Sequence, residues 1–234
     1  MISVCLATYN GEKFINEQIN SILQQLNTHD ELIISDDGSL DETLSIIEKF
    51  SDPRITVHRN NFHCPVRNFE YLIGKAKGDF IFLSDQDDVW ATDKVRIFVQ
   101  YFHNNPGVSL ILSDIQIIDK EGFSVDKKFY TKGFRKGLIQ NILINNFIGC
   151  SMAFRKDLLS KVLPFPDKTP MHDWWIGLCA ILFSKVLFVD NKLTFYRRHD
   201  SNVTKDEGGA IYQKSFWRIY LVIMLFKRYL KQLI

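Results

Sequence analysis

The stretch FLSDQDDVW, from Phe82 to Trp90, places three carboxylates directly after an apolar run. The acids are Asp85, Asp87 and Asp88. Aspartate is a poor strand former, and a carboxylate costs free energy to bury unless a cationic group meets it. The apolar run therefore predicts a buried strand, and the acids that follow it predict either an exposed loop or a metal site.

Strand and helix patterns alternate on the N-terminal side of this stretch. Segments with apolar residues at helical spacing separate the apolar runs, and one of them opens with Ser39 and Glu42, which have the form of a capping box. The order predicts a mostly parallel, doubly wound α/β sheet. The runs that predict strands are ISVCLA (2–7), ELIIS (31–35), RITVH (54–58) and DFIFLS (79–84).

The composition is that of a folded protein. Hydrophobic residues make up 46% and charged residues 24% of the 234 residues, and the net charge of +2 gives no reason to invoke a nucleic-acid partner. The four cysteines form no CxxC pair and are expected to be reduced. We expect a cytoplasmic protein, because no charged leader precedes the first apolar run and Tyr220–Phe226 is far shorter than the ~20 residues of a membrane span.

Polar clusters follow three of the predicted strands: ATYNGE (7–12), SDDGSLDE (35–42) and SDQDD (84–88). Each cluster alone is explained by turn chemistry. Since ligands of open α/β sheets bind beyond the carboxyl ends of the strands, three clusters at such ends predict one shared crevice.

A diphosphate in this crevice would need a cation. The sequence has no GxxxxGK[ST] loop and no GxGxxG, which disfavours P-loop and dinucleotide sites. Adjacent carboxylates suit Mg²⁺ or Mn²⁺, which bridge phosphate oxygens. We therefore interpret Asp85 and Asp87 as a D-x-D clamp for a metal-bound diphosphate.

Five segments of the chain, which include these clusters and are given below in their order along the sequence, resemble inverting glycosyltransferases of the GT-A superfamily. Members of this superfamily transfer sugars from nucleotide diphosphates. The resemblance covers about residues 1–205, and the SDQDDVW form is most similar to bacterial rhamnosyl- and galactosyltransferases that build O-antigen or capsular polysaccharide. It implies an α/β fold of the GT-A (Rossmann-like) type, with a mostly parallel central sheet flanked by helices and a C-terminal helical extension. The segments are TYNGEKFINEQINSILQQ, ISDDGSLDET, PVRNFEYLIGKAKGDFIFLSDQDDVW, HDWW and YRRHDSNVT.

The resemblance also implies a division of the chain. We expect a glycosyltransferase domain over 1–205, with a nucleotide-sugar half (1–118) and an acceptor half (119–205). An amphipathic basic C-terminal helix is expected over 206–234. The absence of an internal repeat or low-complexity linker argues against separate domains.

Roles in donor binding follow from the positions that match the family's motifs. Asp88 matches as well, although a solvated carboxylate or a helix-start residue explains it equally well. The implied roles are the nucleoside pocket for Thr8, Tyr9 and Asn10, the pyrimidine base or ribose for Asp37, and the base or its neighbours for Arg67. Asp85 would approach the ribose and metal, and Asp87 would be the main metal ligand.

The second half supplies the implied catalytic base, Asp173 in MHDWW, although a helix N-cap is the alternative role. His199 in YRRHDSN matches a family histidine that helps hold the metal or diphosphate; an ordinary exposed histidine is the alternative. Trp174 and Trp175 offer flat faces for an acceptor sugar, with one of them expected in the core.

The implied reaction moves a sugar from a UDP- or dTDP-sugar to a hydroxyl of a growing surface polysaccharide, with a lipid-linked saccharide as the expected acceptor and Mn²⁺ or Mg²⁺ as cofactor. Two alternatives stay open. A sugar nucleotidyltransferase would need a glycine-rich and basic N-terminal loop, which ATYNGEKF does not supply. A catalytically inactive nucleotide-sugar-binding or scaffold module would be expected to have lost Asp87, Asp173 or His199.

The C-terminal segment KSFWRIYLVIMLFKRYLKQLI (214–234) is apolar over most of a helix surface and holds five Lys/Arg and no acid. It is expected to pack on its own domain, to form a homodimer contact, or to lie on anionic lipid. The last alternative would place the protein peripherally on the inner face of the cytoplasmic membrane.

Overall fold

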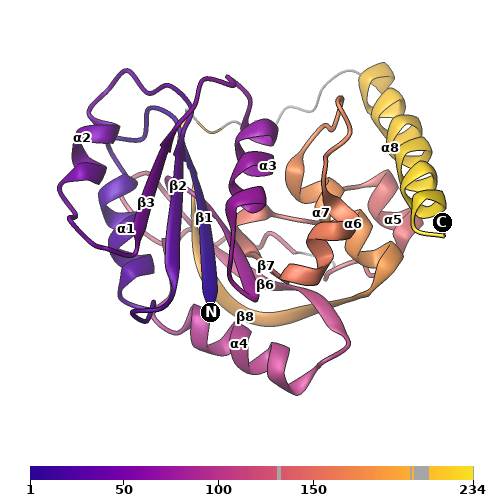
Figure 1. Ribbon diagram of the computed structural model, residues 1–234, viewed down its shortest axis with the longest axis horizontal. Coiled ribbons are helices and arrows are strands. Elements are labelled where there is room, and N and C mark those ends of the chain that lie inside the picture. The colour runs from indigo at the N-terminus through magenta and orange to yellow at the C-terminus, as the bar shows by residue number, and fades with distance from the viewer. Residues whose placement is uncertain (131–132, 201, 203–210, 234) are drawn as a thin grey trace.

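The structure, a computed structural model, describes residues 1–130, 133–200, 202 and 211–233. Within these residues the strands form one sheet in the order β3-β2-β1-β4-β7-β6-β8-β5 (Figure 1). The strands are β1 (Ile2–Thr8), β2 (Glu31–Asp36), β3 (Ile55–Arg59), β4 (Phe80–Asp85), β5 (Val89–Trp90), β6 (Val108–Ile118), β7 (Met152–Arg155) and β8 (Lys185–Arg197). The helices are α1 (Ile15–Leu23), α2 (Thr43–Glu48), α3 (Pro65–Lys75), α4 (Lys94–Asn104), α5 (Leu138–Leu143), α6 (Leu159–Val162), α7 (His172–Phe183) and α8 (Ile211–Lys231).

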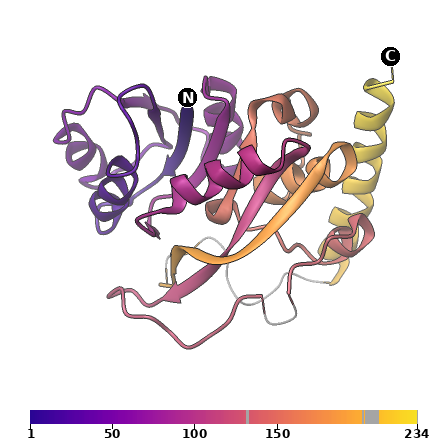
Figure 2. The same cartoon turned by 90° about the horizontal axis from the view of Figure 1, so that it is seen from below.

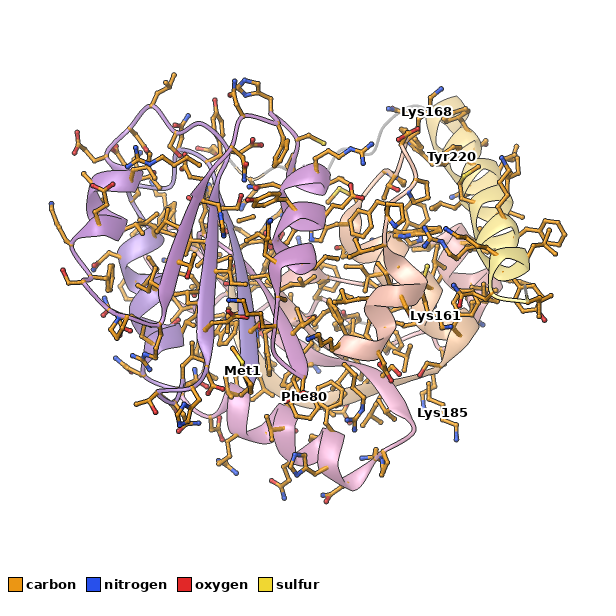
Figure 3. The ribbon with its side chains drawn as sticks, viewed as in Figure 1. Met1, Phe80, Lys161, Lys168, Lys185 and Tyr220 are labelled. Atoms are coloured by element: carbon orange, nitrogen blue, oxygen red, sulfur yellow. The ribbon has the colours of Figure 1, made fainter. Side chains whose placement is uncertain are left out.

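The parallel part of the sheet consists of β3, β2, β1 and β4. At its amino edge the amino group of Met1 lies 2.9 Å from an Asp79 carboxylate oxygen, and Figure 3 shows Met1 and Phe80 side by side there. The carboxyl ends of these strands therefore meet at the opposite edge, as the polar clusters predict. The mostly parallel α/β sheet of the sequence interpretation is confirmed.

The second half of the sheet is mixed. Strand β7 runs antiparallel to both β4 and β6, while β8 is parallel to β6. Residues 86–88, which we call the acidic loop, join β4 to the two-residue strand β5. Strand β5 pairs antiparallel with β8. Because β8 comes from the second half of the chain, both halves of the sequence contribute to the part of the sheet next to the acidic residues.

Side chains alternate between two hydrophobic cores, one on each face of the sheet. Val4 and Leu6 lie in the core beneath α1 and α4, whereas Cys5 between them lies in the core beneath α3 and α7. This alternation is the period-2 geometry of a strand that is covered on both faces. Figure 2 shows the long strands β6 and β8 running beneath the helices.

The capping-box interpretation of Ser39 and Glu42 is wrong. Helix α2 begins at Thr43, and no side chain caps it. The Ser39 hydroxyl instead donates to the Asp36 carboxylate (2.5 Å) and accepts the backbone N–H of Asn10 (2.8 Å). The hydroxyl oxygen therefore accepts from Asn10 rather than from an N–H group of the helix, and the two bonds join the loops after β1 and β2.

Helix α8 packs against its own domain. Leu221 and Leu225 are buried in the core that also contains the inner face of α7. The Tyr220 hydroxyl accepts the backbone N–H of Lys168 (3.1 Å), and Figure 3 shows these two residues close together beside α8. Of the expected C-terminal segment, residues 206–210 and 234 lie outside the described residues. Among the helices that the structure describes, none has the length and apolar character that crossing a membrane requires.

Candidate active site

A cavity of about 440 Å³ opens at the carboxyl edge of the sheet. Its floor comes from the ends of β1 and β4, and its walls come from the start of α3, the start of α7 and the chain after β8. The lining therefore combines residues that are far apart in the sequence. It includes Thr8, Tyr9, Asp37, Cys64, Asn68, Phe69, Asp85, Gln86, Asp87, Gly149, His172, Asp173, Tyr196 and Asn202.

Two acids at the end of β4, Asp85 and Asp87, line this cavity, and Asp88 is buried beside them. Ligand atoms of Asp85, Asp88 and Cys150 lie within 4.8 Å of one another. Burial raises the pKa of Asp88 to about 7, with the Asp87 charge adding to the effect, and burial beside the same acids raises the pKa of Asp85. The buried Asp88 Oδ2 has no hydrogen-bond partner among the described residues. Such a group favours a cation.

Two buried basic side chains lie beneath these acids. Lys94, which is fully buried, donates from Nζ to the Cys150 carbonyl (2.6 Å) and the Thr194 hydroxyl (2.9 Å). Arg197 donates from its backbone N–H to Asp88 Oδ1 (3.0 Å) and from Nε to the Asp87 carbonyl (2.8 Å). Its guanidinium also pairs with Glu17 of α1 at 2.6 Å. The Arg197 contacts fix the acidic loop (residues 86–88), whereas Lys94 ties α4 to Cys150 and β8 beneath it.

Asp87 faces the end of β8. His199 Nε2 lies 2.8 Å from Asp87 Oδ2, and the Asn202 side-chain amide donates to the same oxygen (3.0 Å). The His199 ring is stacked with Phe14, with centroids 4.9 Å apart. The structure thus brings together Asp87 and His199, which are 112 residues apart and were both predicted as metal ligands.

The donor atoms at this edge fit a divalent ion. Carboxylate oxygens and an imidazole nitrogen are ligands that Mn²⁺ accepts, and carboxylates alone suit Mg²⁺. An unpartnered buried carboxylate oxygen and several neighbouring acids supply the negative charge that such an ion would neutralise. The Cys150 thiol beside Asp88 is part of the same cluster, but burial raises its pKa and keeps it protonated.

Gln86, the middle residue of the D-x-D sequence, has a definite role. Its Oε1 accepts from the Thr8 hydroxyl (2.6 Å) and the Tyr9 backbone N–H (2.7 Å), and its Nε2 donates to the Tyr9 carbonyl (3.0 Å). These bonds join the end of β1 to the acidic loop and leave the half-exposed Tyr9 ring at the cavity.

Asp37 lines the cavity, and both oxygens of its carboxylate accept hydrogen bonds from the backbone. It accepts the backbone N–H groups of Phe62, His63 and Cys64 at 2.5, 3.0 and 2.9 Å. Asp37 therefore shapes the loop that precedes α3.

Two other predicted nucleotide contacts lie outside the cavity lining. Asn10 has a positive φ of 49°, and its side-chain oxygen accepts the backbone N–H of Leu40 (2.9 Å). Arg67 pairs with Glu70 (2.6 Å) and Asp167 (3.1 Å). Both side chains thus have protein partners and hold loops in place.

Asp173 lines the same cavity at the start of α7. It is 7% exposed, and its oxygens accept the backbone N–H groups of Trp174 (2.5 Å) and Gly149 (3.2 Å). Burial raises its pKa to about 6, and these hydrogen bonds offset part of the effect. A carboxylate with this pKa is ionised at neutral pH and is basic enough to take a proton from a reacting hydroxyl.

The two tryptophans differ in position. Trp175 is completely buried in the core, and its indole donates to the Val162 carbonyl (3.0 Å). Its faces are therefore not available to an acceptor sugar, which corrects that prediction. Trp174 is partly exposed, donates to the Asn141 carbonyl (2.7 Å) and does not line the cavity.

Comparisons with known proteins agree with this architecture. The sequence profile described as glycosyl transferase family 2 matches residues 3–163. The chain is 28% identical to the dTDP-rhamnosyl transferase RfbG of Shigella flexneri, over 84% of this chain and 72% of that protein. It is 29% identical to an Escherichia coli protein, the UDP-Glc:alpha-D-GlcNAc-diphosphoundecaprenol beta-1,3-glucosyltransferase WfgD, over 95% of this chain and 91% of the other.

Among solved structures, TarS of Staphylococcus aureus in complex with UDP-GlcNAc has a similar fold. The TM-score is 0.75 at 19% identity, over 95% of this chain and 66% of the TarS chain. This likeness shows a shared fold. Since the chain spans 66% of that structure and 72% of RfbG, parts of both proteins have no counterpart in it.

The buried ammonium of Lys94 is expected to stabilise the acidic edge. Lys94→Met keeps most of the side-chain volume but removes two hydrogen bonds and the charge near Asp85 and Asp88. We expect the free energy of unfolding to fall by roughly 3 kcal/mol, measured by urea denaturation. The matched exposed variant Lys127→Met should change it by less than about 0.5 kcal/mol. Equal stability of Lys94→Met and the wild type would contradict this role.

Proposed function

This chain belongs to glycosyl transferase family 2, and we propose that it is a metal-dependent inverting enzyme that moves a sugar from a UDP- or dTDP-sugar to a hydroxyl of a growing, lipid-linked surface polysaccharide. The observation that carries the proposal is the cavity itself. Its lining combines Asp85 and Asp87, which suit a metal-bound diphosphate, with Asp173, a buried carboxylate with a pKa of about 6. A reacting sugar would lie between them.

The donor half of the cavity suits a nucleoside diphosphate. The Tyr9 ring can stack on a flat base, and Thr8 and Asp37 line the adjacent wall. Asp85, Asp87 and His199 would hold Mn²⁺ or Mg²⁺, and the ion when bound would offset the charge that develops on the departing diphosphate. Asn202, which bonds Asp87, is the further residue that we assign to this end.

The acceptor half suits general base catalysis. Asp173 would accept the proton of the acceptor hydroxyl as that oxygen forms a bond to the anomeric carbon. The bond from this carbon to the diphosphate oxygen breaks, and the electron pair leaves with the diphosphate. Attack from the face opposite the leaving group inverts the anomeric configuration, and no covalent glycosyl-enzyme intermediate is needed.

The relatives support the choice of donor and acceptor classes. RfbG is named for a dTDP-sugar, and WfgD for a UDP-sugar and a diphosphoundecaprenol-linked acceptor. We propose the same two donor classes and a lipid-linked saccharide for this chain. Of the residues first assigned to the acceptor, Trp174 is the one with a partly exposed ring, and we retain it as an acceptor contact.

An acceptor anchored in lipid requires access to a membrane surface, and we propose that the outer face of α8 provides it. The outer face is apolar: Ile219, Val222, Ile223, Phe226 and Leu230 are all exposed. Two of the basic residues are also exposed, Lys227 and Lys231. Two others are engaged with the domain, since Arg218 donates to the Leu143 carbonyl and Arg228 to the Leu163 carbonyl. The apolar face is therefore expected to contribute more to membrane binding than charge does.

Metal dependence tests the donor site. With a panel of UDP- and dTDP-sugars and Mn²⁺ or Mg²⁺, the wild type should release the nucleoside diphosphate. EDTA or Asp87→Asn should abolish release and weaken nucleoside diphosphate binding at least tenfold, while the circular dichroism spectrum is unchanged. The exposed control Asp126→Asn should behave as wild type. Full turnover in EDTA would overturn the metal assignment.

The base assignment predicts a pH profile. Because Asp173 must be ionised to accept a proton, kcat should be flat above its pKa and fall about tenfold per pH unit below about pH 6. Asp173→Asn should lower kcat by ~10²-fold or more at pH 7.5 and leave donor affinity within a few fold. Equal losses of donor binding and turnover would make Asp173 a donor ligand or a structural residue.

The α8 surface predicts binding to vesicles. The double variant Ile223→Ser/Phe226→Ser should reduce co-sedimentation with phosphatidylglycerol vesicles about tenfold or more, because two apolar side chains no longer enter the lipid. Phe123→Ser changes a phenylalanine outside α8 that is at least as exposed (72%, against 61% for Phe226), serves as the control and should bind as wild type. If the double variant instead abolishes a dimer seen by size-exclusion chromatography, the face binds a second copy of the chain.

A further inference from the structure

We propose that Asn145 is a positioning residue for the base, because its side-chain amide bonds the Asp173 carboxylate and favours the ionised form that accepts a proton. The inference rests on the proposed function, since it names a residue that supports the same base. Asn145 follows α5 and does not line the cavity, so it would act on the reaction only through Asp173.

Three N–H groups bond the Asp173 carboxylate, and they are divided unevenly between its oxygens. Oδ1 accepts the backbone N–H of Trp174 (2.5 Å) and the side-chain amide of Asn145 (3.4 Å). Oδ2 accepts the backbone N–H of Gly149 (3.2 Å). Each carboxylate oxygen can accept about two hydrogen bonds, so Oδ1 is filled and Oδ2 keeps one position. An acceptor hydroxyl would therefore donate its proton to Oδ2.

The Asn145 amide has a fixed orientation. Its Oδ1 accepts the backbone N–H of Phe147 (2.9 Å). A backbone N–H group can only donate, so this bond assigns the amide oxygen to Phe147 and the amide nitrogen to Asp173.

The segment that carries this amide is held against α7. Gly177 lies four residues after the base on one face of the helix, and a Cβ there would overlap the Phe147 ring. The Trp174 indole donates to the Asn141 carbonyl of α5 (2.7 Å). Asn145 lies in sequence between these two contacts, so the protein itself keeps the amide beside the carboxylate.

The charge of the base depends on these N–H groups. Burial raises the pKa of Asp173 to about 6, and the hydrogen bonds offset part of the rise because they stabilise the ionised form. No neighbouring titratable group replaces them with positive charge at neutral pH, since burial lowers the pKa of His172 to about 3. The titratable groups that face the base from the surrounding elements are Asp85, Asp87, Tyr130, Cys150, His172 and Tyr196.

Two variants and a matched control separate this role from loop structure. Asn145→Ala removes both side-chain bonds. Asn145→Asp keeps an oxygen for the Phe147 N–H but replaces the amide donor with a second carboxylate, whose charge opposes ionisation of the base. Asn146→Ala is the control, because the amide of this residue donates to the Ile144 carbonyl (2.9 Å) and the Asn141 side chain (3.3 Å) instead.

The first readout is the pH profile of kcat, measured as nucleoside diphosphate release from the preferred sugar nucleotide with Mn²⁺. The acidic limb, near pH 6 in the wild type, should move up by about 0.5 pH unit or more in Asn145→Ala and by about one unit or more in Asn145→Asp. The Asn146→Ala profile should match the wild type. The Kd of the nucleoside diphosphate should stay within about twofold in all three variants.

The second readout needs no turnover. The pKa of the base can be followed by ¹³C NMR of protein labelled at the aspartate carboxyl carbons, with Asp173→Asn identifying its resonance. The pKa should be lowest in the wild type and Asn146→Ala, higher in Asn145→Ala and highest in Asn145→Asp.

Other outcomes would overturn the inference. A pH profile and an NMR pKa that both Asn145 variants leave unchanged would make Asn145 a structural residue only. An equal shift in Asn146→Ala would trace the effect to the loop as a whole. If the NMR pKa shifts as expected but the wild type turns over no sugar nucleotide, or Asp173→Asn keeps full turnover, the proposed function or its base assignment fails instead, and the catalytic role of Asn145 fails with it.

Discussion

The site depends on positive charge and N–H groups placed beneath the carboxylates at the end of β4. Asp85, Asp87 and Asp88 follow one another within four residues, and mutual repulsion would drive them apart if nothing opposed it. Lys94 lies below them as a buried ammonium, and Arg197 holds the backbone of the loop from the end of β8. The three acids can therefore stay close together, with Asp85 and Asp87 lining the cavity and Asp88 buried beside them.

The sequence pattern predicts the first half of the fold well. Runs such as ISVCLA and DFIFLS are buried on both faces, and this leaves a continuous apolar signal that a parallel sheet explains. The prediction of a capping box at Ser39 was wrong, because the local sequence pattern does not show that the Ser39 hydroxyl bonds the Asp36 carboxylate instead of capping α2. The mixed part of the sheet gave a weaker signal, since β7 has only four residues and its partners come from distant segments.

Within the site, the sequence located the charged residues at strand ends. It did not reveal the residues that hold those strand ends and loops in place, such as Lys94 and Gln86. Asp87 and His199 were expected to act together, and they lie in contact. Lys94 and Gln86 look like ordinary surface residues in the sequence, because their importance arises only when β8 and β1 approach the acidic loop.

The path of β8 has a consequence for how such proteins can diversify. Strand β8 lies between β6 and β5, so the last strand of the described chain is inserted among elements that precede it in sequence. The segment from 3 to 163 that the family profile matches thus lacks the strand that holds its own acidic loop. Exchanging C-terminal segments between relatives would break the loop's support unless Arg197 and the β5 pairing were preserved. Changes of acceptor should therefore arise by substitution at partly exposed positions such as Trp174 more readily than by exchange of whole C-terminal segments.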